Sequence, residues 1–153
     1  MLDIPWPEQY LLHIEKKIDI NAAVAIVFAA LLEQLGPAAD RPDGTPMPMI
    51  LEPWPGGRWY RDLGNNTGHF WGQVQVIKPP TLLEITGPMF MSYPVISHVQ
   101  YRLTEQSGQT RLTLLHRAIG DIAPEHRKGV NGGWEYILSR VKGRALESAT
   151  KCG

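Results

Sequence analysis

Residues 52–87, EPWPGGRWYRDLGNNTGHFWGQVQVIKPPTLLEITG, are the stretch from which the fold can be predicted. Three strand-like segments lie here, separated by turn-forming residues: Gly64–Gly68 (GNNTG) after the first and Lys78–Pro80 (KPP) after the second. Breaks rich in glycine, asparagine and proline between short strands indicate a consecutive antiparallel meander. Because the segments on both sides have helical patterns, we expect the sheet to wrap one face around a helix and to enclose a cavity.

The segment before the meander predicts one strand, one helix and one loop. Apolar residues alternate with polar ones over Tyr10–Ile20, as in a half-buried strand. Asn21 is expected to cap the next helix, because its side chain can accept a hydrogen bond from the first free N–H groups. That helix is predicted over Ala22–Leu35, where apolar residues recur at helical spacing, and Gly36–Pro37 ends it. Residues 37–46 are expected to form a surface loop.

Further strands and a long helix complete the predicted fold. Met47–Glu52 is expected to add a strand before the meander, and Ile96–Thr104 with Arg111–Ile119 to form a last hairpin. Which face of residues 67–77 points inward stays open. A helix is predicted over 124–146, opened by a proline that is typical of a first helical turn. Its apolar stripe consists of Val130, Trp134, Ile137, Leu138 and Val141.

Three glycines fall within this last helix. They are Gly129, Gly132 and Gly133. Glycine costs about 1 kcal/mol relative to alanine in a helix interior. Three interpretations therefore stand: a kink, a helix that begins nearer Gly133, or a surface that a ligand or the sheet approaches closely.

Composition narrows the possible functions. The chain of 153 residues is expected to form a single domain, residues 1–153, with its core over 10–147. Fifteen basic residues balance fifteen acidic ones, so we expect no nucleic-acid partner, and no apolar run is long enough for membrane insertion. The lone Cys152 argues against a disulfide framework and a cysteine-based zinc site. No cofactor or metal is implied, no signal peptide is evident, and a cytoplasmic location is expected.

Several short motifs occur in an order that resembles a known superfamily. They are Asn21–Phe28 (NAAVAIVF), Gly56–Trp59 (GGRW), Trp71–Val74 (WGQV), Pro79–Pro80, Leu82–Ile85, Thr110–His116 (TRLTLLH) and Gly132–Trp134 (GGW). Over residues 19–147 the chain resembles the SRPBCC superfamily, the helix-grip fold of birch-pollen allergens, START lipid-transfer domains and aromatic polyketide cyclases. Within it, the chain most resembles the bacterial family named for activators of the heat-shock-protein ATPase. The resemblance implies an α+β fold whose curved antiparallel sheet of about six or seven strands wraps around a long C-terminal helix.

One fold of this kind hosts many functions, so three hypotheses stand. The first is a binding protein that holds a small hydrophobic molecule, lipid-like or aromatic and polycyclic, in its cavity. The second is a cyclase or aromatase, in which His116, Tyr101 and Arg61 handle protons. The third, taken from the family name, is a regulator of a chaperone ATPase; that role relies on an additional partner-binding domain, for which we expect no room here. Because no known catalytic motif occurs, binding is the first hypothesis.

The candidate ligand-binding residues follow from strand parity and from the stripe on the C-terminal helix. They are Trp59, Arg61, Phe90, Tyr93, Val99, Tyr101, Leu114, His116, Trp134, Ile137 and Leu138. On the last two strands, parity points Tyr101 and His116 inward, and burial there lowers the pKa of the imidazole. On the first strand of the meander, parity with Leu63 points Trp59 and Arg61 inward.

Each candidate also has a purely structural interpretation. Tyr101 and His116 fit a core in which both bond to nearby backbone or water. Trp134 can instead fill space in the core without contacting a ligand. Arg61 reaches solvent if its strand is twisted. The aromatic segment Phe90–Tyr93 fits either a rim of the cavity or a homodimer interface.

Overall fold

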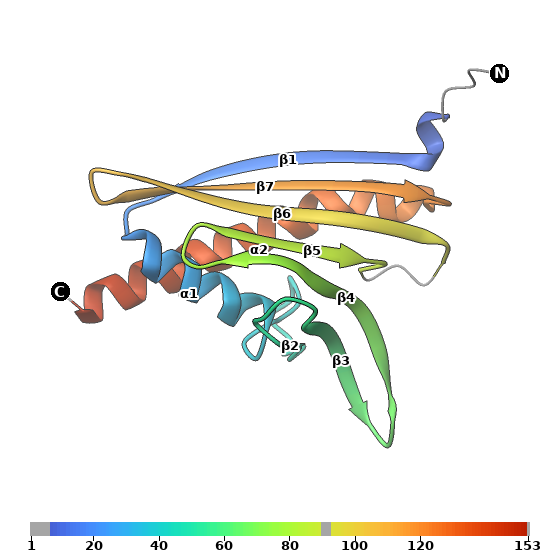
Figure 1. Ribbon diagram of the computed structural model, residues 1–153, viewed down its shortest axis with the longest axis horizontal. Helices are drawn as coiled ribbons and strands as arrows, with labels where there is room; N and C mark the ends of the chain where they lie inside the picture. Colours follow the sequence, from blue (N-terminus) through green and yellow to red (C-terminus); the bar gives the residue numbers. More distant parts are fainter. Residues whose placement is uncertain (1–6, 90–92, 153) are drawn as a thin grey trace.

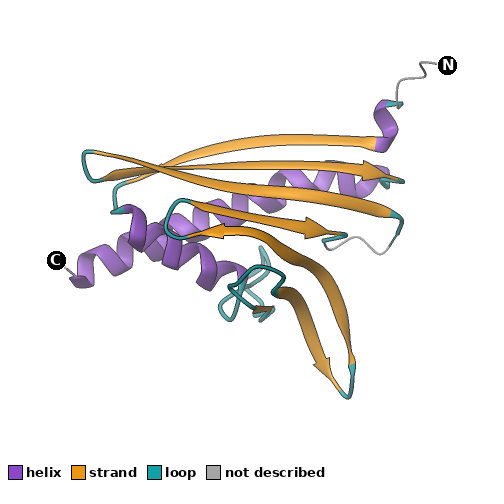
Figure 2. Ribbon diagram, in the orientation of Figure 1, coloured by secondary structure: helices purple, strands orange, loops and turns teal. Residues whose placement is uncertain are grey.

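The computed structural model describes residues 7–89 and 93–152, and within them seven strands form one antiparallel sheet in the order β1-β7-β6-β5-β4-β3-β2. In chain order the elements are η1 Glu8–Tyr10, β1 Leu11–Ile20, α1 Val24–Leu35, β2 Ile50–Leu51, β3 Arg58–Gly64, β4 Thr67–Lys78, β5 Leu82–Gly87, β6 Val95–Gln106, β7 Gln109–Gly120 and α2 Pro124–Cys152. Figure 1 shows α2 crossing behind the strands, and Figure 2 shows both helices on one side of the curved sheet. The predicted helix-grip fold is confirmed.

The core lies between the sheet and the two helices. Buried and exposed residues alternate along β6 and β7, as expected for strands with one face on a core. The buried residues of α2 are Val130, Trp134, Leu138, Val141 and Ala145. Their spacing of three or four residues places them on one face of the helix. Burial of each aliphatic side chain contributes about 1.5–3 kcal/mol, so this stripe holds α2 against the sheet.

Helix α2 is longer than its pattern predicted. It begins at Pro124, so the interpretation that the helix starts near Gly133 was wrong. It ends at Cys152, six residues beyond the predicted end at residue 146. The three glycines therefore lie inside a continuous helix.

The start of α1 corrects another prediction. The N-cap residue is Ala23 rather than Asn21, and no side chain of the cap residue bonds the helix. Instead, the Glu105 carboxylate accepts a hydrogen bond from the backbone N–H of Val24 at 3.1 Å. Glu105 lies near the C-terminal end of β6, so a residue distant in sequence caps the helix in place of a local side chain.

The strand expected over residues 47–52 is reduced to the two residues of β2. The backbone N–H of Met47 donates to the carbonyl of Ala39 at 2.9 Å, and that of Met49 donates to Gly36 at 3.0 Å. The first bond closes the loop that follows α1 and the second ties it to the end of α1, so both N–H groups are satisfied without pairing with the sheet.

Strand β3 also departs from simple alternation. Its register against β4 shifts directly after Trp59 and again around Leu63, and such shifts re-aim side chains. Leu63 is consequently 52% exposed, so its predicted inward orientation was wrong, and Arg61 is only half-buried. Asn65 and Asn66 both have positive φ, as a two-residue hairpin turn requires. The β3–β4 ribbon bends away from the body of the protein (Figure 1).

The buried residues of β4, whose inward face the sequence left open, are Gly72 and Val74. A Cβ atom on Gly72 would lie 2.7 Å from the carbonyl oxygen of Thr86. A side chain at this position would collide with the backbone of β5, so glycine is required here.

Candidate functional site

A cavity of about 330 Å³ lies between α2, the end of α1, strands β3 and β4, and residues 37–49, which we call the covering loop. Arg41, Pro42 and Gly129 line the cavity and are exposed, so its mouth lies between the covering loop and α2. Three parts of the chain that are distant in sequence thus enclose one space.

The wall of the cavity is mainly apolar. Its apolar lining residues are Leu35, Ala39, Met47, Met49, Trp59, Trp71, Met89, Val130, Trp134 and Ile137. Three of the chain's five tryptophans are among them. Methionine side chains are flexible and polarisable, so three of them beside rigid indoles make a wall that is partly fixed and partly adaptable.

Two of the indoles are held in place by their own hydrogen bonds. Trp59 Nε1 donates to the carbonyl of Leu35 at 2.7 Å, and Trp134 Nε1 donates to His116 Nδ1 at 2.9 Å. Trp59 also meets Trp71 edge to face, with ring centroids 5.1 Å apart. Because both N–H groups are used inside the protein, Trp59 and Trp134 offer the cavity apolar ring surface.

His116 is completely buried behind Trp134. Its Nε2 lies 2.8 Å from Ser97 Oγ, and its Nδ1 accepts from the indole of Trp134. Since an indole N–H can only donate, Nδ1 carries no proton, and the neutral ring holds its proton on Nε2, which donates to Ser97. Burial lowers the pKa of His116 to about 4. The predicted inward orientation is confirmed, and the direction of the pKa shift agrees with the expected effect of burial, but His116 does not line the cavity.

Tyr101 occupies a similar place in the core. It is fully buried, and its ring lies edge to face against Trp134 with centroids 6.2 Å apart. Its hydroxyl has no hydrogen-bond partner among the residues that the structure describes. Burial raises the pKa of Tyr101. Tyr101 and His116 are thus core residues that pack against Trp134. The expected partners differ, because His116 bonds two side chains rather than backbone or water.

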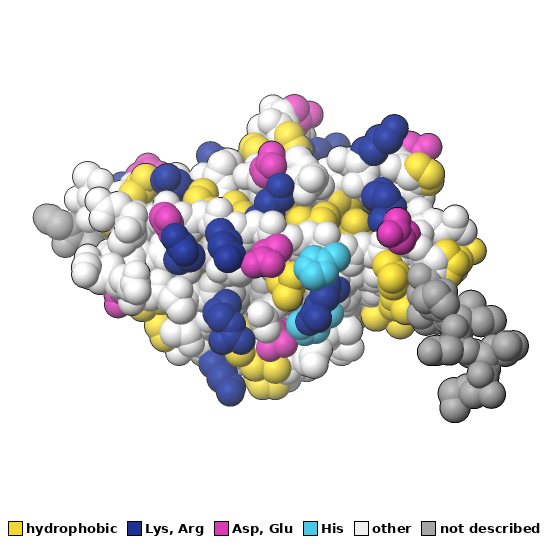
Figure 3. All heavy atoms as spheres, turned by 90° about the horizontal axis from the view of Figure 1, so that it is seen from above, with side chains coloured by type: hydrophobic (Ala, Val, Ile, Leu, Met, Phe, Trp, Pro, Cys, Tyr) yellow, Lys and Arg dark blue, Asp and Glu magenta, His cyan; other side chains and the backbone are white. Residues whose placement is uncertain are grey.

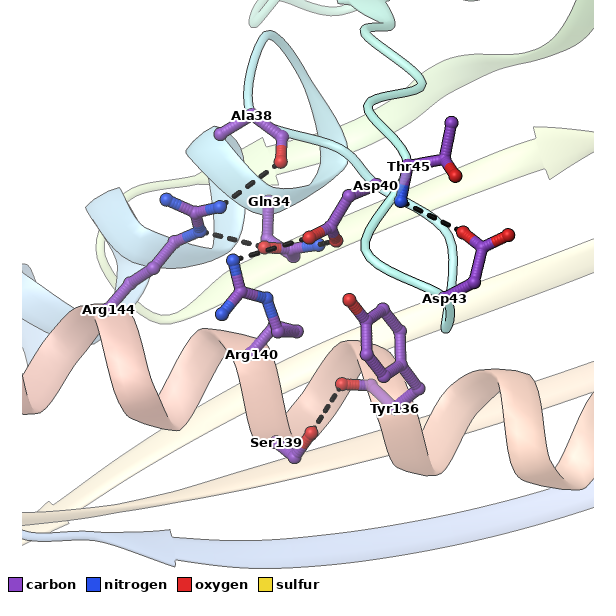
Figure 4. A network of polar contacts seen from close by, with 9 residues as sticks. All are labelled: Gln34, Ala38, Asp40, Asp43, Thr45, Tyr136, Ser139, Arg140 and Arg144. Carbon is purple, nitrogen blue, oxygen red and sulfur yellow. Dashed lines mark hydrogen bonds and ion pairs between the residues drawn. The ribbon is translucent and has the colours of Figure 1, made fainter.

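One end of the cavity is polar (Figure 4). Gln34, Asp40 and Tyr136 line it there. The carboxylate of Asp40 accepts from Gln34 Nε2 at 2.9 Å and lies 3.3 Å from the guanidinium of Arg140. Burial by itself raises the pKa of Asp40; hydrogen bonds from Gln34 and Tyr136, with the nearby positive charges, outweigh burial and hold that pKa below its usual value. Asp40 is therefore an ionised group at the edge of an apolar space.

The same polar contacts fasten the covering loop to α2. Arg144 donates to Gln34 Oε1 at 2.7 Å and to the carbonyl of Ala38 at 3.1 Å, while Arg140 reaches Asp40. A guanidinium group binds several acceptors in a fixed geometry. Two arginines one helical turn apart therefore hold the loop over the cavity.

A second contact lies near the start of α2. The hydroxyl of Tyr93 is 2.6 Å from His126 Nδ1, and the two rings stack with centroids 5.3 Å apart. His126 lines the cavity, whereas Tyr93 does not. Tyr93 therefore contacts a lining residue without being one itself.

The sequence-predicted site residues divide into three groups. Trp59, Trp134 and Ile137 line the cavity. Seven others do not: Arg61, Tyr93, Val99, Tyr101, Leu114, His116 and Leu138. Phe90 and Met91 of the proposed rim or dimer segment fall outside the described residues, whereas Tyr93 of that segment is described. Val99, Leu114 and Leu138 are buried in the core, and the register shifts of β3 explain why Arg61 does not reach the cavity.

The lining residues outside the predicted set come from the covering loop, from α1 and α2, and from β4 and Met89. Met47 and Met49 alternate with prolines in the sequence PMPM, which is an apolar signal that was assigned to a strand. Gly129 and Gly133 also line the cavity, one helical turn apart. The sequence had singled them out, and close approach of a ligand or the sheet was one of the three interpretations. No pattern in the sequence marks the loop residue Ala39 as a lining residue.

Neither a metal site nor a membrane-spanning helix is found in the described parts of the chain. No group of three or more histidine, cysteine, aspartate or glutamate side chains gathers there in a way that could hold a metal ion. None of the described helices has the length and apolar character needed to cross a membrane. On the face drawn in Figure 3, basic and acidic side chains are interspersed, as the balanced composition suggests.

Comparison with known proteins identifies relatives of this architecture. A sequence model of the family described as "Activator of Hsp90 ATPase homolog 1-like protein" matches residues 22–145. No curated protein matches the sequence.

Solved structures share the fold at low sequence identity. Protein MLL2253 from Mesorhizobium loti is 16% identical with a TM-score of 0.66, over 89% of this chain and 98% of that one. CalU16 from Micromonospora echinospora is 22% identical with a TM-score of 0.62, over 91% and 79%. The di-domain ARO/CYC StfQ from the steffimycin biosynthetic pathway is 13% identical with a TM-score of 0.63, over 94% of this chain and 53% of that one. At such identities the likeness extends to the fold alone.

Proposed function

This chain belongs to the activator of Hsp90 ATPase homolog 1-like family, and from that premise we propose that it binds a small hydrophobic molecule in the tryptophan-lined cavity. The observation that carries the proposal is the contrast within one space of about 330 Å³: an apolar wall with three indoles, and a polar end at Asp40 and Tyr136. Small-molecule sites have this size and this combination of apolar surface with a few placed polar groups.

The wall supplies affinity and the polar end supplies orientation. Apolar surface removed from water contributes about 25 cal/mol per Å². The carboxylate of Asp40 is already engaged by Gln34 and Arg140, so it stays fixed in place when a ligand enters. A ligand hydroxyl placed at this end can donate to the remaining lone pairs of the carboxylate.

The geometry favours binding over the cyclase hypothesis. Both ring nitrogens of His116 are engaged, by Ser97 and Trp134, so the imidazole has no lone pair available for a ligand proton. Neither Tyr101 nor Arg61 lines the cavity. The three groups assigned to proton transfer therefore have no contact with the space in which a reactive chain would lie.

The third hypothesis, regulation of a chaperone ATPase, stays a prediction that rests on the family description. A pull-down with the chaperone would test it. The homodimer hypothesis likewise stays a prediction, and its test is the mass of the protein in solution.

Titration with 8-anilinonaphthalene-1-sulfonate, followed by displacement with 2-naphthol or lauric acid, tests the binding proposal. We expect saturable binding of about one dye per folded chain. Ala39→Phe places a ring in the cavity, because Ala39 is buried and lines it, and should abolish binding. Ala25→Phe adds the same ring at an exposed position of α1 outside the cavity, and should not change it. Equal binding by both variants, or none by the native protein, would refute the proposal.

A further inference from the structure

We propose that Gly129, at the mouth of the cavity, and Gly133, one helical turn further along α2, form a flat side of the cavity, which we call its floor, and select a planar ligand of about two fused aromatic rings. This inference rests on the proposed function, since it specifies what the same cavity holds.

The first step concerns the position of the two glycines. Gly129 and Gly133 lie in the interior of α2 and both line the cavity. Residues four apart in a helix lie on the same face, about 6 Å apart along the axis. Together they leave a strip of bare backbone on the side of α2 that faces the cavity.

The second step is that neither glycine is required by packing. A Cβ atom at Gly129 or Gly133 would meet no heavy atom within 4 Å, and neither has a positive φ. Alanine therefore fits at both positions, and it is the better helix former. The consequence of glycine at these two sites is additional open space over the helix.

The third step concerns the shape of that space. The indoles of Trp59 and Trp134 border it and are fixed by their hydrogen bonds. Rigid aromatic walls favour flat aromatic guests, which stack or meet them edge to face. An apolar cavity of about 150 Å³ holds one benzene ring. The cavity here measures about 330 Å³, so it suits about two rings.

A comparison of two probes of the same skeleton tests the planar preference. 2-Naphthol is flat, and decahydro-2-naphthol has the same ring framework and hydroxyl but a puckered, saturated shape. Isothermal titration calorimetry on the native protein should show 2-naphthol binding about tenfold more tightly. Equal or tighter binding of the saturated probe would overturn the planar preference.

Alanine substitutions test the floor. Gly129→Ala and Gly133→Ala should each raise the melting temperature by about 2–4 °C through helix propensity, yet weaken 2-naphthol binding about tenfold by placing a methyl group in its way. The matched control is Gly132→Ala. Gly132 is exposed, does not line the cavity and also has open space for a Cβ atom. This control should raise the melting temperature equally and leave the affinity unchanged.

The outcomes distinguish failure of the proposed glycine floor from failure of the proposed binding in the cavity. If the Gly129 and Gly133 variants bind 2-naphthol as the native protein does, the floor is refuted while binding in the cavity stands. If either variant lowers the melting temperature, the open geometry at that glycine is refuted. If the native protein binds neither probe and no dye, the proposed function fails and the inference fails with it.

Discussion

Lowering the pH from 7 to 5 should reduce the free energy of unfolding by about 2 kcal/mol, because His116 is neutral in the folded protein. The imidazole is completely buried, and burial lowers its pKa from 6.5 to about 4. Protonation in the folded state would also put a proton on Nδ1, where Trp134 already donates. The folded protein therefore resists the charge that the unfolded chain accepts.

The direction of the effect follows from which state binds the proton first. The folded pKa is the lower one, so the unfolded chain is protonated first as the pH falls. The stability associated with neutral His116 is complete above the unfolded pKa of about 6.5 and is lost as the pH falls toward 4. The whole difference corresponds to about 3 kcal/mol, of which about 2 kcal/mol falls between pH 7 and pH 5.

Urea unfolding at pH 7, 6 and 5 measures this loss. The measurement stops at pH 5 because the carboxylates with lowered pKa values, such as Asp40, lose their contribution only below about pH 4.5. His116→Gln should lose most of the pH dependence, whatever its stability at pH 7. His13→Gln, at an exposed position of β1, should keep the native pH dependence.

NMR of the ring nitrogens provides an independent check. We expect His116 to be protonated on Nε2 alone at pH 7 and to stay neutral at pH 5. A midpoint for His116 near 6.5, or an undiminished pH dependence in His116→Gln, would refute the reasoning. In either case, the loss of stability at low pH would come from the titration of another group.

Three further substitutions make predictions that urea unfolding can check. Tyr101→Phe should leave the free energy of unfolding unchanged or raise it by up to about 1 kcal/mol. The reason is that the hydroxyl it removes is buried without a partner among the described residues. A clear loss of stability would mean that the hydroxyl is hydrogen-bonded. Thr110→Val should cost about 1–3 kcal/mol, because Thr110 Oγ1 donates to the carbonyl of Ala22 at 2.7 Å, whereas Thr110→Ser should retain most of that stability. Trp134→Phe should cost about 1–3 kcal/mol by leaving His116 Nδ1 without its donor, and an unchanged tautomer and stability would contradict the assigned hydrogen bond.

Local patterns were sufficient to predict most of the elements and the faces they bury. The alternation along β7 placed His116 inward, and the stripe on α2 placed Trp134 against the sheet, as found. Asn65 and Asn66 marked the β3–β4 turn correctly. Such predictions succeed because the periods of strands and helices are properties of neighbouring residues, so the sequence records them directly.

The cavity itself was decided by tertiary structure. Hydrogen bonds from Met47 to Ala39 within the loop and from Met49 to Gly36 at the end of α1 turned an expected strand into the covering loop. Register shifts in β3 took Arg61 away from the interior. A buried face can meet either packed side chains or empty space, and only the relative placement of distant segments determines which. The sequence by itself therefore determined that Trp134 and His116 point inward, while only the tertiary structure decided that Trp134 borders the cavity and His116 lies behind it.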